Sequence, residues 1–326
     1  MSGDALNASD IYDIIHLRLP EEEVRDLLLK LTPDQVDPST FNQFLSVMAE
    51  SGLPFPISDT KVLDCCGTGG SGLPHYNTST TVAFVLAAGG VPVVKFGNRG
   101  MSSSCGSFDF LEAIGIPFEV KAEQAAEILG KSGVVFLYAP QWYPALGPFN
   151  KLRRSLGIRT IFNFMGPLLN PVKPSYKLLG VSHATMQERM ATYLADRTAT
   201  ERALVVRADN NLDEVHYDGK TSMYHVSQNG VVVEEFYTSS HAKSKLAEYP
   251  LTVQDNLSIF ERVINGEDQT SAYYQLITLN AGAGFYVAGQ ASSILEGTTY
   301  AAELLHTGKV VETVGSCRNA YAQYLD

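Results

Sequence analysis

A glycine-rich run, GTGGSG at residues 67–72, lies between two apolar stretches of different character. The stretch before it, 62–66, is typical of a buried strand. The stretch at 82–88 is typical of a helix, with N-cap candidates at 77–80. A strand, a glycine loop and a capped helix point free backbone N–H groups and the positive end of the helix dipole at an anion. We therefore expect this run to bind phosphate or pyrophosphate, with an ordinary tight turn as the alternative.

Two neighbouring carboxylates, Asp213 and Glu214, follow a predicted strand at 203–207 and a short loop. Mg²⁺ commonly takes one or two carboxylates together with substrate oxygens, so the pair is a candidate metal site. The alternative is a pair of exposed acids. A second cluster of charge is basic and could be either an exposed helix face or the source of one inward-pointing arginine; its members are Lys151, Arg153, Arg154 and Arg159.

Charge and cysteine usage exclude several classes of protein. The formal net charge of −11 argues against sequence-independent binding of nucleic acid, which depends on clustered Lys and Arg. The four cysteines form no CxxC, and the seven histidines form no HxxxH or HExxH, so we expect reduced thiols, a cytoplasmic protein and no zinc site. No apolar run approaches membrane-spanning length, so no membrane partner is expected.

The elements that must position these residues alternate along most of the chain. Residues 10–52 are expected to be helical. From residue 61 on, predicted strands alternate with helices, which indicates an α/β fold with a mostly parallel sheet and helices on both faces. The carboxyl ends of such strands form the usual ligand site, and the glycine run lies there together with a second small-residue loop at 100–107. The predicted strands are 61–66, 91–95, 117–120, 134–139, 178–182 and 203–207, followed by a hairpin within 215–240.

Five motifs in order resemble the anthranilate phosphoribosyltransferase family. They are GTGGSG (67–72), NTST (77–80), KFGNRGMSS with GS (95–107), RRSLGIRTIFNFMGPLLNP (153–171) and DE (213–214). The resemblance covers roughly residues 60 to 315. It implies a small helical domain, residues 1–58 joined by part of 141–175, beside a larger α/β domain, residues 59–326, of the nucleoside phosphorylase and phosphoribosyltransferase type.

The resemblance also implies an activity. Family members transfer a phosphoribosyl group from phosphoribosyl pyrophosphate (PRPP) to the amino nitrogen of anthranilate in tryptophan biosynthesis, with two Mg²⁺ ions and as homodimers. No protein side chain acts as the nucleophile, so no residue is expected to be catalytic in that sense. Positions matching the motifs would bind PRPP: Gly67, Gly69, Gly70, Ser71, His75, Asn77, Ser79, Thr80, Lys95, Gly97, Asn98, Arg99, Ser103 and Ser107. Ser79 would also hold one Mg²⁺, Asp213 and Glu214 the second, and Asn98 and Arg153 would meet the acceptor.

The sequence departs from the family motifs at Phe96 and Tyr143, where histidines are usual, and these positions lie near the expected acceptor site. One alternative is therefore an enzyme of the same class with a different aromatic or heterocyclic acceptor. A pyrimidine nucleoside phosphorylase of the same fold is a second alternative, and a binding homologue without catalysis is a third. Ser71 and His75 also depart from the family's glycine-loop pattern.

Overall fold

A seven-stranded sheet organises the computed structural model, which describes residues 6–56, 60–74, 76–100 and 105–324. The strand order is β3-β2-β1-β4-β5-β6-β7. The first five strands along the chain are parallel, and β6 and β7 form the expected antiparallel hairpin at one edge. The strands are β1 (Leu63–Gly67), β2 (Val93–Gly97), β3 (Val134–Tyr138), β4 (Tyr176–Gly180), β5 (Arg202–Ala208), β6 (Gly219–Ser227) and β7 (Gly230–Thr238). The expected α/β class with a mostly parallel sheet is confirmed.

The register of β1 and β4 brings their following loops together. Gly67, the last residue of β1, pairs with Gly180, the last residue of β4. The carboxyl ends of β1, β2 and β4 therefore share one edge of the sheet, and the loops after them converge there. The order reverses beside β1, because β2 and β3 lie on one side of it and β4 and β5 on the other.

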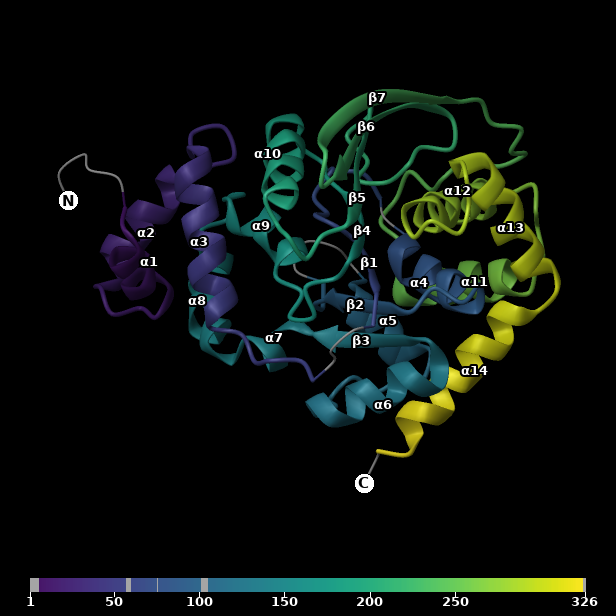
Figure 1. Ribbon diagram of the computed structural model, residues 1–326, viewed down its shortest axis with the longest axis horizontal. Coiled ribbons are helices and arrows are strands. Elements are labelled where there is room, and N and C mark those ends of the chain that lie inside the picture. The colour runs from purple at the N-terminus through teal and green to yellow at the C-terminus, as the bar shows by residue number, and fades with distance from the viewer. Residues whose placement is uncertain (1–5, 57–59, 75, 101–104, 325–326) are drawn as a thin grey trace.

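Helices cover both faces of the sheet, as Figure 1 shows. One face is covered by α4 (Thr78–Ala88), which contacts β1, and by α12 (Ala272–Val287), which contacts β4 and β5. On the opposite face α10 (Ala184–Ala195) packs on β5 and β6. Helix α4 is apolar all round, which is typical of a helix buried between layers. The helices of this part are α4 (Thr78–Ala88), α5 (Ser107–Ala113), α6 (Ala122–Ser132), α7 (Ala139–Trp142), α10 (Ala184–Ala195), α11 (Val253–Ile264), α12 (Ala272–Val287), α13 (Ile294–His306) and α14 (Lys309–Ala322).

The N-terminal helices form a separate group at one end of the molecule (Figure 1). They are α1 (Ala8–Ile15), α2 (Glu21–Lys30) and α3 (Pro38–Glu50). Two later short helices are α8 (Gly147–Ser155) and α9 (Phe162–Met165), of which α9 packs on α3 and α8 contacts α9 through Phe149 and Phe162. Phe44 contacts Phe162 with 5.2 Å between ring centroids, and the Ile161 N–H donates to the Leu31 carbonyl. A helical domain of residues 1–58 joined by part of 141–175 stays a prediction, and its boundary at 58/59 lies outside the described residues.

The strand expected at 117–120 does not form. Pro117 lacks an N–H for a sheet ladder, and Phe118 instead packs its ring on Phe108 and Tyr138, with centroids 5.1 and 4.8 Å away. The segment is therefore an extended connection between α5 and α6. The apolar pattern that favours a strand in the sequence is explained by Phe118, whose ring packs on other rings and not in the sheet.

Candidate active site

A cavity of about 560 Å³ lies at the edge where the loops after β1 and β2 converge. Eight of the residues predicted from the motifs line it: Gly67, Gly69, Gly70, Asn77, Ser79, Ser107, Asp213 and Glu214. They come from four separate motifs, and the last two lie well over a hundred residues from the first. The fold therefore brings the glycine loop, the start of α4 and the acidic pair to one site.

Asp213 is held against the ends of two strands. A Cβ atom on Gly67 would lie 2.2 Å from its Oδ2 atom, and one on Gly180 would lie 1.6 Å from its carbonyl oxygen. Only glycine leaves room for Asp213 at these two positions. Its Oδ2 atom accepts a hydrogen bond from the Gly69 N–H at 2.7 Å. The carboxylate therefore contacts the glycine loop directly, with one backbone N–H of the loop donating to it.

Glu214 is adjacent to that carboxylate and lines the same cavity. Burial raises the pKa of the Glu214 carboxyl well above its ordinary value, and the charge of Asp213 raises it further. Two carboxylates that disfavour each other's charge form an oxygen-rich site that a divalent cation would stabilise. Ser79 adds a hydroxyl to the same lining. Among the described residues no group of three His, Cys, Asp or Glu side chains could hold a metal, so substrate oxygens would have to complete the coordination.

Asn77 stands at the N-cap of α4, but its side chain does not cap the helix. The Asn77 Nδ2 atom donates to the Cys105 carbonyl at 3.3 Å and to Asn256 Oδ1 at 3.1 Å. Asn256 Oδ1 also accepts from the Asn77 backbone N–H at 3.0 Å. Asn77 therefore ties the start of α4 to α11 and to the end of the second loop, so it is a structural junction as well as part of the cavity lining.

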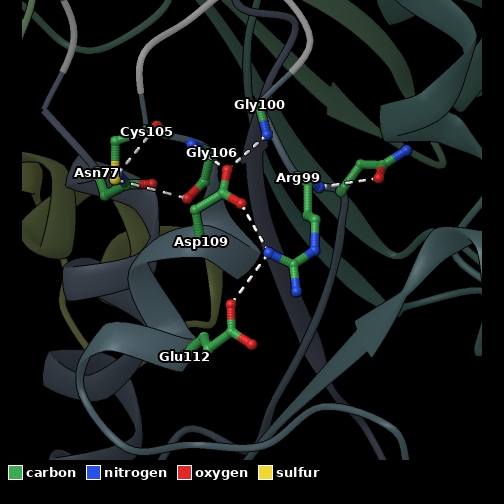
Figure 2. A network of polar contacts seen from close by, with 8 residues as sticks. Asn77, Arg99, Gly100, Cys105, Gly106, Asp109 and Glu112 are labelled. Carbon is green, nitrogen blue, oxygen red and sulfur yellow. Dashed lines mark hydrogen bonds and ion pairs between the residues drawn. The ribbon is translucent and has the colours of Figure 1, made fainter. Parts of the chain in front are cut away.

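The second loop is closed at its base by Asp109 (Figure 2). The Asp109 Oδ2 atom accepts hydrogen bonds from the Gly100 and Gly106 N–H groups at 2.8 and 2.9 Å. Arg99 Nη1 donates to Asp109 Oδ1 and to Glu112 Oε2, each at 3.0 Å. The backbones approach closely here, since a Cβ atom on Gly106 would lie 1.9 Å from the Gly100 nitrogen. Asp109 thus fixes where the loop leaves and rejoins the protein.

The remaining predicted donor-site residues do not line this cavity. Arg99 points its guanidinium at Asp109 and Glu112, and Lys95 is buried on β2. Thr80 is fully buried, and its hydroxyl has no hydrogen-bond partner among the described residues. Gly97, Asn98 and Ser71 lie near the same edge but outside the lining, and His75 and Ser103 lie outside the described residues.

Arg153 provides a half-buried positive charge on α8. Its Nη1 atom donates to Asn150 Oδ1 at 2.9 Å, and its guanidinium lies 5.4 Å from the centre of the Phe162 ring. Burial and, to a smaller extent, the charge of neighbouring Arg154 lower the pKa of Arg153 to about 10. The buried Nε–H has no acceptor, and no carboxylate in the described part of the chain pairs with this arginine. The arrangement favours an anion such as a carboxylate as its ligand.

Phe96 and Tyr143, the two aromatic departures from the family motifs, contact each other. Their ring centroids are 5.7 Å apart with planes at 72°, an edge-to-face arrangement. The Tyr143 hydroxyl donates to the Leu169 carbonyl at 2.6 Å, and both side chains are buried. The pair therefore links the end of β2 to the turn that precedes β4.

Comparisons with known proteins identify the family. Residues 59–311 match the model of the glycosyl transferase family a/b domain. The chain is 38% identical over 96% of its length to anthranilate phosphoribosyltransferase of Syntrophomonas wolfei, covering 93% of that protein. The crystal structure of the Thermus thermophilus enzyme aligns with a TM-score of 0.86 at 30% identity, covering 98% of this chain and 97% of that one. The chain belongs to the anthranilate phosphoribosyltransferase family. The Saccharomyces cerevisiae enzyme in complex with PRPP and Mg shares the fold, with a TM-score of 0.84 at 22% identity over 98% and 94% of the two chains.

The anthranilate phosphoribosyltransferase motifs gave no role to two residues that the structure places at the glycine loop. Arg159 donates to the Gly69 and Gly70 carbonyls, and Ser182 Oγ donates to the Gly69 carbonyl at 2.7 Å. Arg159 belongs to the basic cluster of 151–159, for which the sequence leaves open an exposed helix face or one inward-pointing arginine. Ser182 carried no sequence signal.

In the part of the chain that the structure describes, no helix is long and apolar enough to cross a membrane.

Proposed function

We propose that this protein transfers the 5-phosphoribosyl group of PRPP to the amino nitrogen of anthranilate and releases pyrophosphate, a reaction of tryptophan biosynthesis. The observation that carries the proposal is the convergence of the glycine loop, the N-terminus of α4 and the Asp213–Glu214 pair on one cavity. Backbone N–H groups beside a carboxylate pair suit a diphosphate that arrives with a cation. Family membership supports the identity of the donor and the acceptor.

The donor side acts by binding the leaving group. Backbone N–H groups of the glycine loop and the first turn of α4 present fixed positive dipoles to the charge that grows on the departing pyrophosphate. Asp213, Glu214 and Ser79 are the oxygen ligands that would hold Mg²⁺, which when bound neutralises that charge. The Saccharomyces cerevisiae enzyme, crystallised with PRPP and Mg, supports this assignment of donor and metal.

The acceptor side acts by orientation. Arg153 offers a guanidinium that can bind a carboxylate through two parallel hydrogen bonds, which would fix the ring of the acceptor and the direction of its amino group. Asn98 is the second residue proposed to meet the acceptor. The amine attacks the ribosyl carbon directly, so the protein must only hold it close and exclude water. The Saccharomyces cerevisiae enzyme in complex with 4-fluoroanthranilate supports an anthranilate-like acceptor.

A fluorescence assay with PRPP, Mg²⁺ and anthranilate tests the proposed reaction. We expect loss of anthranilate only when all three are present and release of one pyrophosphate for each anthranilate consumed. Omission of Mg²⁺ should stop the reaction. Absence of turnover under these conditions, in protein that melts cooperatively, would contradict the proposal.

A different acceptor is the second candidate, because the edge-to-face pair of Phe96 and Tyr143 stands where the family motif usually has histidines. Two apolar rings would favour a less polar aromatic or heterocyclic amine. Turnover of PRPP should be measured across anthranilate, ring-substituted anthranilates and amines without the carboxylate. The highest kcat/KM with an amine that lacks the carboxylate would favour this candidate. It would show that pairing a carboxylate with Arg153 does not decide which acceptor is used.

We further propose two Mg²⁺ ions for each site, a homodimer and a cytoplasmic location. The four cysteines are buried thiols, which supports a reducing compartment. Metal titration against bound PRPP would give the number of ions, and sedimentation equilibrium would give the mass of the assembly. One ion for each site, or a monomer at micromolar concentration, would contradict the respective proposal.

A further inference from the structure

Arg159 lies outside the cavity but holds the glycine loop that lines it through hydrogen bonds. Its Nη1 atom donates to the Gly70 carbonyl at 2.8 Å and to Ser182 Oγ at 3.1 Å, and its Nη2 atom donates to the Gly69 carbonyl at 3.0 Å. The guanidinium also lies 4.6 Å from the centre of the Phe164 ring. The cavity lining does not include Arg159, so its contacts with the site run through the backbone of the glycine loop.

The geometry of the peptide bond turns this grip into an orientation of N–H groups. In a planar trans peptide the C=O of one residue and the N–H of the next point in opposite directions. Holding the Gly69 carbonyl on Arg159 therefore aims the Gly70 N–H away from Arg159. Positive φ angles at Gly69 (+62°) and Gly70 (+72°) permit this run, which other residues rarely adopt. The Gly70 N–H has no acceptor among the residues that the structure describes.

Ser182 completes the grip from the end of β4. Its hydroxyl accepts from Arg159 and donates to the Gly69 carbonyl, while its backbone N–H donates to Thr68 Oγ1 at 3.1 Å. On the other side, Asp213 accepts the Gly69 N–H. The Gly69 peptide groups are thus held on both sides before any ligand binds, which lowers the entropic cost of binding a diphosphate there.

We propose that Arg159 is a positioning residue that aims the glycine-loop amides at the diphosphate of the donor without touching the substrate. The inference rests on the proposed function, because it assumes that the loop binds a diphosphate. It differs from that function in assigning donor affinity to an arginine that lies behind the loop. Arg153, six residues earlier, serves the acceptor, so the two arginines of one segment have separable effects.

Calorimetry with inorganic pyrophosphate and Mg²⁺ tests this role directly. We expect Arg159→Ala to weaken pyrophosphate binding and to raise the KM for PRPP by roughly ten- to a hundredfold, because hydrogen bonds from a charged donor are lost. The KM for anthranilate should change less than about twofold, a difference within the usual spread of such measurements. Arg154→Ala is the matched control, since that arginine is exposed and its side chain bonds only to the Asn150 carbonyl in the described structure. It should leave both constants unchanged.

Two further variants keep the test sound if Arg159→Ala folds poorly. Ser182→Ala removes one of the three acceptors and should raise the KM for PRPP by a smaller factor, again without affecting anthranilate. Guanidinium at millimolar concentration should restore part of the pyrophosphate affinity of Arg159→Ala and none of any loss in the control.

Three outcomes would overturn the inference. Unchanged pyrophosphate affinity in Arg159→Ala would show that the loop does not need the grip. An equal rise in the KM values for PRPP and anthranilate would show a general effect on the fold. If the wild-type protein itself fails to bind pyrophosphate or PRPP with Mg²⁺, the proposed function fails and the role of Arg159 fails with it, which is distinguishable from the first two results.

Discussion

Arg153 and Arg159 are separated by five residues, yet their surroundings differ in a way that decides their roles. The guanidinium of Arg159 donates hydrogen bonds to two carbonyl oxygens and to one hydroxyl. Arg153 keeps a buried Nε–H without an acceptor in the described structure, and burial depresses its pKa to about 10. A buried cation without a counter-charge is costly, and an acceptor carboxylate would remove that cost. Arg153 is therefore the residue on which acceptor affinity should depend.

Arg153→Ala should raise the KM for anthranilate roughly ten- to a hundredfold, the loss expected for a charge-assisted hydrogen bond. The KM for PRPP should change little, because Arg153 does not line the donor cavity. Steady-state kinetics with each substrate varied in turn would measure both constants. Lys151→Ala removes an exposed cation of the same helix and serves as the control. A raised KM for PRPP with an unchanged KM for anthranilate would contradict the assignment of Arg153 to the acceptor.

At the scale of elements, the loop between β2 and α5 depends on one carboxylate. Burial disfavours the charged form of Asp109, but the N–H groups of Gly100 and Gly106 and the Arg99 guanidinium outweigh burial and lower the pKa of Asp109. The folded state therefore prefers the ionised carboxyl more than the unfolded chain does. Its contribution to stability is complete above the unfolded pKa and is lost as pH falls through the lower folded pKa.

Asp109→Ala should lower the free energy of unfolding by about 2 kcal/mol near neutral pH, since it leaves the Gly100 and Gly106 N–H groups without their acceptor and removes one of the two acceptors of Arg99. The difference from wild type should begin to shrink as pH falls below about 4, where the unfolded chain takes up a proton at Asp109, and should vanish as pH falls through the lower pKa of the folded state. Denaturant titrations at several pH values would measure it. Glu112→Gln is the control, because the Glu112 side chain is exposed and bonds only to Arg99 among the described residues. A difference independent of pH would show that the charge of Asp109 is not what holds the loop.

Tyr143 links the segment after β3 to the turn before β4. Tyr143→Phe removes the hydroxyl that donates to the Leu169 carbonyl but keeps the ring contact with Phe96. We expect the free energy of unfolding to fall by about 1 kcal/mol, the usual net value of one hydrogen bond. Thermal denaturation would measure the change. An unchanged midpoint would mean that water replaces the hydroxyl at the Leu169 carbonyl.

The strand, glycine loop and helix around residue 70 could be predicted from the sequence because their signals are local. An apolar run, clustered glycines and polar residues before a second apolar run each specify their own backbone. The contacts of Arg159 could not be predicted in this way, because its partners, Gly69 and Gly70, lie about ninety residues earlier in the chain. The prediction of a strand at 117–120 was wrong because it relied on a local apolar pattern alone. In the structure these apolar residues pack against other aromatic rings and do not pair with a strand.

At the scale of the whole molecule, the site exists only because the sheet assembles pieces from distant parts of the chain. The glycine run follows β1, whereas Asp213 follows β5 and reaches the loop between two strand ends that lack side chains. The helical group around α3 brings Arg153 from a third segment. The residues proposed to bind the donor and Arg153, proposed to bind the acceptor, therefore come from different segments of the chain.

Calorimetric titration of PRPP, with and without Mg²⁺, is the most direct test of the central claim that the glycine loop and the Asp213–Glu214 pair bind the donor together with the cation. Wild-type protein should bind PRPP tightly only with Mg²⁺. The double variant Asp213→Asn, Glu214→Gln should lose the Mg²⁺-dependent part of the affinity while its thermal midpoint stays near that of wild type. Binding by the double variant that is as tight and as Mg²⁺-dependent as that of wild type would contradict the account.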